Sequence, residues 1–119
     1  MLNDSSVPIN FLKNNVKNFV VERDWEKYHN PKDLAVSISV EAGELLEIFQ
    51  WRSVDEIMDM IKEEKWINRI SEELADIFIY ILSMANVLNI DLTTIVLEKL
   101  KKNAEKYPVE KYKGRAFIT

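Results

Sequence analysis

Apolar residues in the first part of the chain recur at the three- and four-residue steps of an amphipathic helix. This first stripe consists of Ile9, Leu12, Val16, Phe19 and Val20. We expect the helix to begin near Asp4–Ser6, which are good N-cap residues, with Pro8 in its first turn. The pattern fades around Glu22 to Trp25. The segment DWEKYHNP is then a connector, because Pro31 disfavours helix at Asn30.

The middle of the chain predicts two long helices joined by a short one. The first long helix starts near Pro31 or Lys32 and continues to about Trp51, with a stripe of Leu34, Ile38, Glu41, Leu45 and Ile48. Ser53 followed by Glu56 is typical of a capping box, which predicts a short helix from about Val54 to Glu63. The second long helix covers roughly Glu64 to Leu88 and closes at Asn89. Its main apolar face consists of Ile70, Leu74, Ile77, Ile81, Met84 and Leu88.

The last predicted helix runs from about Leu92 to Tyr107, capped by Asp91 and ended by Pro108. The tail VEKYKGRAFIT has no clear periodicity. The pattern therefore predicts an all-α, four-helix-bundle-like subunit of four main helices and a short connecting helix, in one domain spanning 1–119. A core of this size is marginal alone, so we expect the most apolar helices to be shared with a second subunit.

Composition excludes several other classes of protein. The 119 residues contain only two Gly and three Pro, which argues against an all-β fold. The net charge of −4 disfavours a nucleic-acid binder, and the absence of cysteine excludes disulfides and thiolate metal sites. No apolar run approaches the roughly 20 residues of a membrane span, and the N-terminus lacks the pattern of a signal peptide. The expected location is the cytoplasm, without membrane or nucleic-acid partners.

Two pairs of carboxylates sit in or beside the apolar stripes of the two long helices. Glu41 and Glu44 form one pair, and Glu73 and Asp76 form the other. Residues three apart share a helix face, so packing of the two helices would bring four carboxyl groups together. Such a group repels itself unless a hard divalent cation binds, and oxygen ligands suit Mg²⁺ or Mn²⁺. Gly43 would let another helix or a ligand approach closely.

Other interpretations of these carboxylates remain open from the residues alone. Each pair is also common on a solvated helix face, and Glu47 is either a surface charge or a contact to a metal-bound water. A di-iron carboxylate bundle needs Glu-x-x-His motifs, and the single histidine, His29, lies in the connector. Lys99, Asn103 and Lys106 share one face of the last helix, which is either solvated or directed at phosphates.

Four blocks of sequence, in order, resemble a known family. They are ERDWEKYHNPKDL, VEAGELLEIFQW, EELADIFIYIL and KLKKNAEKYP. Together they resemble the MazG-like all-α nucleoside triphosphate pyrophosphohydrolases, and most of all the dCTP pyrophosphatase branch. The resemblance covers about Glu22 to Pro108.

The resemblance implies a function and a set of site residues. Glu41, Glu44, Glu73 and Asp76 would bind Mg²⁺. The base and sugar pocket would be formed by the segment from Trp25 through Tyr28 to His29, with Trp51 and Tyr80. Lys99, Asn103, Lys106 and Tyr107 would face the phosphates. The implied reaction cleaves a (deoxy)nucleoside triphosphate between the α and β phosphorus atoms, in subunits that assemble as dimers or tetramers.

The chemistry of the residues is compatible with that reaction. Metal held by the carboxylates would neutralise phosphate oxygens, and Glu44 or Glu47 would accept a proton from the attacking water. The resemblance therefore implies hydrolysis of a dNTP to dNMP and pyrophosphate in nucleotide pool clean-up, with dCTP or a modified dCTP preferred. The alternatives are a nucleotide sensor without turnover, a related pyrophosphatase with another base preference such as dUTP, and a plain helical oligomerisation module.

Overall fold

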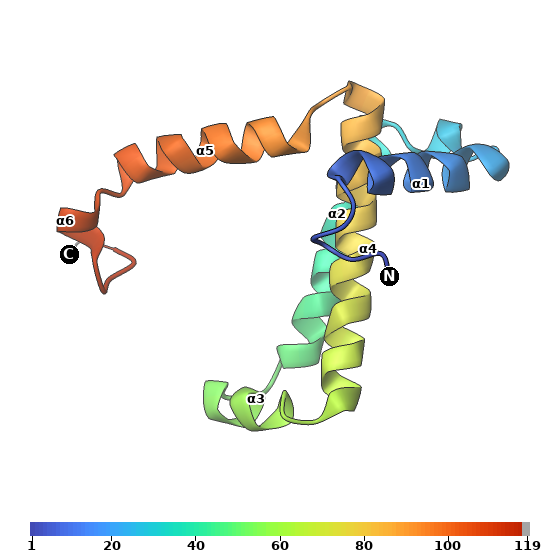
Figure 1. The fold of residues 1–119 in the computed structure, drawn as a ribbon. Coiled ribbons are helices and arrows are strands. Elements are labelled where there is room, and N and C mark those ends of the chain that lie inside the picture. The colour runs from blue at the N-terminus through green and yellow to red at the C-terminus, as the bar shows by residue number, and fades with distance from the viewer. Residues whose placement is uncertain (118–119) are drawn as a thin grey trace. The chain divides into compact units, whose positions relative to one another are not determined.

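Helices account for all the regular secondary structure of residues 1–117, the part of the chain that this computed structural model describes (Figure 1). The chain divides into two compact units, the first comprising Met1–Asn89 and the second beginning at Ile90. The first contains α1 (Ile9–Glu22), a 3-10 helix η1 (Glu26–Tyr28), α2 (Pro31–Phe49), α3 (Val54–Met60) and α4 (Glu64–Leu88). The second contains α5 (Leu92–Lys106) and α6 (Val109–Tyr112). The all-α class is confirmed.

The predicted helix ends are mostly correct because their capping chemistry is local. The side chains of Ser53 and Asp91 accept the backbone N–H groups of Glu56 and Thr94 at the starts of α3 and α5. Asn89 ends α4 in the left-handed conformation, with φ of 55°. The predicted ends of the second, short and last helices run one to three residues beyond Phe49, Met60 and Lys106.

Three local predictions need correction. The N-cap of α1 is Pro8 rather than a residue of Asp4–Ser6. Those residues form a turn in which the Ser6 hydroxyl accepts from the Asn3 backbone N–H at 2.8 Å. The connector contains η1, and the tail contains α6; both are too short to produce a periodic stripe.

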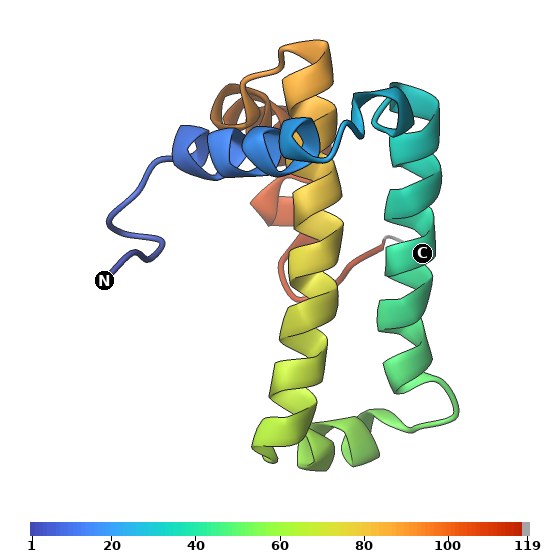
Figure 2. The ribbon, with the colours of Figure 1, turned by 90° about the vertical axis from the view of Figure 1, so that its right-hand side faces the viewer.

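The first unit is built on the pairing of α2 with α4. The two helices run side by side in opposite directions, linked by α3 at one end, and α1 crosses α4 near its C-terminal end (Figure 2). Buried apolar side chains come from all four helices: Val20, Leu34, Ile48, Met60, Leu82 and Ala85. The Asn86 side-chain amide donates to the backbone carbonyl of Lys13 at 2.9 Å, which ties α4 to α1.

The α2 stripe and the α4 stripe differ in how well the pattern predicts burial. Leu34 and Ile48 are buried and Glu41 is half-buried, as expected for α2. On α4, Leu74 and Leu88 remain exposed, whereas Leu82 and Ala85 are buried. Leu82 and Ala85 lie toward the C-terminal end of α4, which α1 crosses, so this part of the helix is covered by a second neighbour besides α2.

Large apolar side chains remain exposed on both long helices. On α2 they are Val36, Val40 and Leu46, and on α4 they include Ile67, Leu74, Phe78 and Ile79. Among the described residues, no single helix is long and apolar enough to span a membrane; only α4 and α5 taken together reach that length and composition.

Candidate metal centre and adjoining pocket

Three carboxylates from the two long helices converge in the first unit. Glu41 from α2 meets Glu73 and Asp76 from α4, and one oxygen atom of each lies within 4.8 Å of the others. Glu73 and Asp76 share a face of α4 because they are three residues apart, and the antiparallel pairing with α2 brings Glu41 opposite them. The structure thus brings together residues from both predicted pairs.

Two oxygen atoms in this cluster are buried without a hydrogen-bond donor. They are Oε2 of Glu41 and Oε2 of Glu73. A buried carboxylate oxygen without a partner is costly, since burial disfavours the charged form. Burial, with the adjacent carboxylate of Glu44, raises the pKa of Glu41 from 4.5 to about 7. Burial and the charge of Glu44 also raise the pKa of Glu73.

The donor set fits a hard divalent cation. The three groups supply only oxygen ligands, and a cation at their centre would satisfy the two unpartnered oxygens and offset the mutual repulsion. Glu44 is exposed and lies next to the cluster, close enough for its charge to act on both Glu41 and Glu73. Glu47 is exposed one turn further along α2, and its contact to a metal-bound water stays a prediction.

The connector after α1 turns Trp25 and His29 back toward α4. Asp24 adopts a left-handed conformation with φ of 52°, which lets the Trp25 backbone N–H donate to the carbonyl of Val20 at 3.0 Å. The η1 turn follows, and the His29 backbone N–H donates to the Glu26 carbonyl at 3.1 Å. This tight path places both rings beside Tyr80 of α4, with the ring centroids of His29 and Tyr80 6.1 Å apart.

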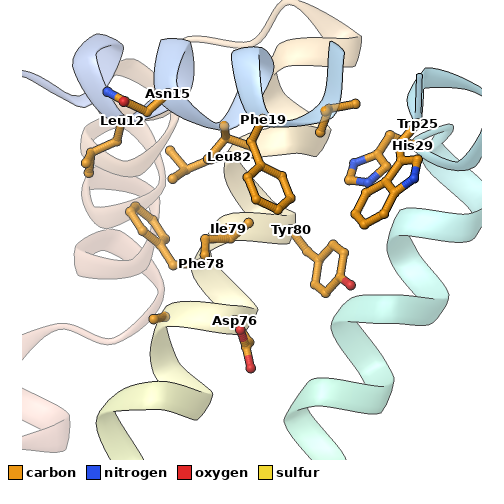
Figure 3. Close-up of a pocket in the computed structure, with 13 residues that line it drawn as sticks. Leu12, Asn15, Phe19, Trp25, His29, Asp76, Phe78, Ile79, Tyr80 and Leu82 are labelled. Carbon is orange, nitrogen blue, oxygen red and sulfur yellow. The ribbon is translucent and has the colours of Figure 1, made fainter. Parts of the chain in front are cut away.

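A pocket of about 560 Å³ adjoins the acidic cluster. Asp76 lies at one end of it, Tyr80 lies one turn along α4, and Trp25 and His29 lie beyond Tyr80 (Figure 3). Apolar side chains from α1 and α4 complete the wall: Leu12, Val16, Phe19, Val20, Ala75, Phe78, Ile79 and Leu82, with the polar Asn15. Asp76 is therefore shared between a charged cluster and an aromatic, largely apolar cavity.

The remaining predicted pocket residues lie elsewhere in the first unit or in the second. Tyr28 is exposed on η1 and Trp51 is 91% exposed just after α2, and neither lines this pocket. Trp51 is at the opposite end of α2 from His29, roughly 28 Å away along a helix of this length. Lys99, Asn103 and Lys106 all lie on α5 in the second unit. Their roles stay predictions.

The space beside Gly43 corrects one expectation. A methyl group added at this position would meet no described atom within 4 Å, so no helix of the first unit approaches closely there. The predicted close approach of a helix is not found within that unit, and the approach of a ligand stays a prediction.

One polar residue of the site region escaped the sequence analysis. Ser83 on α4 is only 3% exposed, and its hydroxyl lies 2.7 Å from Nδ1 of His29. The available signal was a single serine in the apolar run IYILSMANVL, three residues after Tyr80. The partner, 54 residues earlier in the chain, was beyond any local pattern.

An all-helical fold with an acidic cluster between two antiparallel helices, beside an aromatic pocket, is typical of proteins that place a divalent-metal site next to a small-molecule site. Comparison with known proteins narrows this class. Residues 36–116 match the model of the MazG-like family, and the chain belongs to that family.

Relatives and one solved structure agree with this assignment. The chain is 38% identical over 98 residues to dCTP pyrophosphatase 1 from Rattus norvegicus, which covers 82% of this chain and 58% of the relative. It is 37% identical over 90 residues to dCTP pyrophosphatase 1 from Homo sapiens, and this match covers 76% of this chain and 53% of the relative. The chain thus spans little more than half the length of these curated relatives.

The similarity to a solved structure covers almost all of that chain. A pyrophosphatase from Archaeoglobus fulgidus DSM 4304 is 41% identical and superposes with a TM-score of 0.79, covering 91% of this chain and 99% of that chain. The two proteins therefore share their fold along nearly the whole length of the archaeal pyrophosphatase.

Proposed function

We propose that this protein is a Mg²⁺-dependent nucleoside triphosphate pyrophosphohydrolase, converting a dNTP and water to dNMP and pyrophosphate. The observation that carries the proposal is the position of Asp76, which belongs both to the acidic cluster and to the aromatic pocket. A ligand seated in the pocket would extend its charged end toward the cluster. A nucleotide has this form, a flat base and sugar joined to a chain of phosphates.

The residues of the first unit divide into three roles. Glu41, Glu73 and Asp76 would hold Mg²⁺, or Mn²⁺, with Glu44 as a fourth carboxylate at the edge. When bound, the metal neutralises phosphate oxygens and lowers the pKa of a coordinated water. Glu44 is exposed beside the cluster and is the better placed general base; Glu47 is the second candidate. Trp25 and Tyr80 provide flat faces for the base.

The base preference is proposed from the relatives. Proteins named dCTP pyrophosphatase 1 are 37–38% identical to this chain, which favours dCTP or a modified dCTP as substrate. A related preference, such as dUTP, is the alternative. The apolar pocket wall supports binding of a base by stacking and shape, and the proposed role is clean-up of the nucleotide pool in the cytoplasm.

A homo-oligomer, a dimer or tetramer, completes the proposal. Exposed Val40 and Leu46 on α2 and exposed Leu74 on α4 form apolar surface that a second copy would cover. Trp51 is almost fully exposed and has φ of 70°, an unusual conformation for a bulky residue. Because it lies at the far end of α2, Trp51 of a second copy is the one that would join a base pocket. The phosphate roles of Lys99, Asn103, Lys106 and Tyr107 on or next to α5 are part of the same proposal.

Hydrolysis of a panel of dNTPs and NTPs, with and without Mg²⁺, tests the function. We expect metal-dependent formation of monophosphate and pyrophosphate in equal amounts, with loss of turnover in Glu41→Gln and Asp76→Asn. Glu72→Gln, an exposed carboxylate on α4 beside Glu73, is the matched control and should retain activity. Nucleotide binding without turnover would favour the sensor, and neither binding nor turnover would favour the oligomerisation module.

Shared sites between subunits have a separate test. Trp51→Ala and Asp76→Asn would each be inactive alone. If Trp51 acts across an interface, mixing the two variants should restore part of the activity, because some sites then receive Asp76 from one copy and Trp51 from the other. Mixtures without recovery would show that Trp51 does not act across an interface.

A further inference from the structure

His29 stands between two cavities of the first unit. It lines the pocket of about 560 Å³ with Trp25 and Tyr80, and it also lines a smaller cavity of about 190 Å³. Ser83 lines only the smaller cavity, where its hydroxyl lies 2.7 Å from Nδ1 of His29. The imidazole ring of His29 therefore borders the larger pocket while its Nδ1 contacts the Ser83 hydroxyl of α4.

The hydroxyl of Ser83 differs from that of another serine on the same helix. Ser71 donates its hydroxyl proton to the carbonyl four residues earlier, Ile67, at 2.7 Å, as helical serines often do. Within the part of the chain that the structure describes, Ser83 has no such bond, and Nδ1 of His29 is its partner. Buried hydroxyl protons are normally donated, which favours donation from the Ser83 hydroxyl to Nδ1.

This direction of donation fixes the form of the imidazole. If Nδ1 accepts, the ring is neutral and the hydrogen is carried on Nε2. Burial lowers the pKa of His29 below its ordinary 6.5, which also favours the neutral ring. The charged and titratable groups that line the two cavities with His29 are Lys17 of α1, Glu26 of η1, and Asp76 and Tyr80 of α4.

We propose that Ser83 is a positioning residue: it holds His29 as the Nε2–H tautomer, so that the ring presents a neutral hydrogen-bond donor to an acceptor on the base or sugar of the nucleotide. The binding part rests on the proposed function, and the tautomer does not. A neutral donor suits the aromatic end of the pocket, since the phosphates are drawn toward the carboxylate cluster and its metal.

Nuclear magnetic resonance of ¹⁵N-histidine protein tests the tautomer directly. The chain has one histidine, so the spectrum contains a single pair of ring nitrogens and no assignment to a residue is needed. Couplings to the ring C–H protons distinguish Nδ1 from Nε2. At mildly alkaline pH without nucleotide, we expect Nδ1 to resonate as an unprotonated nitrogen and Nε2 as a protonated one. A protonated Nδ1 in the unaltered protein would overturn the proposal without any variant.

Three variants separate positioning from a structural role. Ser83→Ala should give a mixture of tautomers, whereas Ser71→Ala should leave the spectrum unchanged, and Ser83→Thr should restore the single tautomer. With the preferred nucleotide, Ser83→Ala should raise KM by roughly two- to tenfold, the effect of one ordinary hydrogen bond, with kcat nearly unchanged. An unchanged tautomer, or a changed tautomer with an unchanged KM, would overturn the proposal.

The two parts fail separately. If no nucleotide is turned over, the proposed function fails, while the spectrum recorded without nucleotide still decides whether Ser83 sets the tautomer.

Discussion

Replacing Glu41 with Gln should make the metal-free protein more stable and the Mg²⁺-loaded protein less stable than the unaltered chain. Oε2 of Glu41 is buried without a donor, and the carboxylates of Glu44, Asp76 and Glu73 surround it. Without metal, the ionised side chain is unfavourable in the folded state. Gln removes the charge and offers an amide that donates to the neighbouring carboxylates, but it removes a metal ligand.

The pH dependence of this effect follows from the direction of the pKa shift. The pKa of Glu41 rises from an ordinary 4.5 in the unfolded chain to about 7 in the folded one. Below 4.5 the side chain is protonated in both states, so it carries no ionic penalty. Between these two values the unfolded chain loses its proton first, and the stability of the metal-free protein falls as pH rises. Above about 7 the loss is complete.

The size of the loss can be bounded. At about 1.4 kcal/mol for each pH unit between 4.5 and 7, the upper limit is about 3.5 kcal/mol. The side chain is only half-buried, so solvent screens much of this, and we expect about 1–2 kcal/mol of stabilisation in Glu41→Gln above pH 7. With Mg²⁺ at a hundred times its Kd, the unaltered protein gains about 2.7 kcal/mol, which the variant loses.

Urea unfolding followed by the fluorescence of the three Trp residues measures both effects. Protein concentration must be held constant, since assembly also changes apparent stability. We expect the order of stability of the two proteins to reverse between chelator and saturating Mg²⁺, and the chelator difference to vanish at acid pH. Glu72→Gln, an exposed site on α4, should show neither effect. A variant less stable than the unaltered protein in chelator above pH 7 would refute the argument.

Three other predictions rest on separate observations. Mg²⁺ affinity should rise with pH through about 7, because Glu41 must release its proton to bind metal. Calorimetry on either side of that pH measures the affinity, and a constant affinity would contradict the prediction. Gly43→Ala should stabilise the protein by about 0.5–1 kcal/mol in chemical unfolding, because the space beside it is open and Ala favours helix; a loss would mean that a second copy fills the space. Ser53→Ala should cost about 1 kcal/mol in the same assay, since its hydroxyl caps α3 at 3.1 Å, whereas a cost near zero would show that the cap contributes nothing.

Much of the local structure could be predicted because it depends on neighbouring residues. Ser53, Asp91 and Asn89 end or begin their helices through bonds or conformations within a few residues, so their types and spacing were sufficient. Elements of three or four residues, such as η1 and α6, were missed since they are shorter than one period of a helical pattern.

The acidic site was partly readable for the same reason. Glu41 interrupts an apolar stripe and Glu73 shares a turn with Asp76, which marked them as unusual positions. Sequence spacing placed each pair on one helix face. It gave no means of deciding which of the four carboxylates turn inward, and the structure groups three, with Glu44 at the edge.

The sequence alone thus determined the longer helices, most of their caps and the two acidic turns, because hydrogen bonding within a helix is local. Tertiary structure decided what meets across the chain. The antiparallel pairing of α2 with α4 leaves two carboxylate oxygens buried without donors, and the turn at Asp24 brings His29 to Ser83. These contacts join residues dozens of positions apart, and only the packing of whole helices fixes which of them face one another.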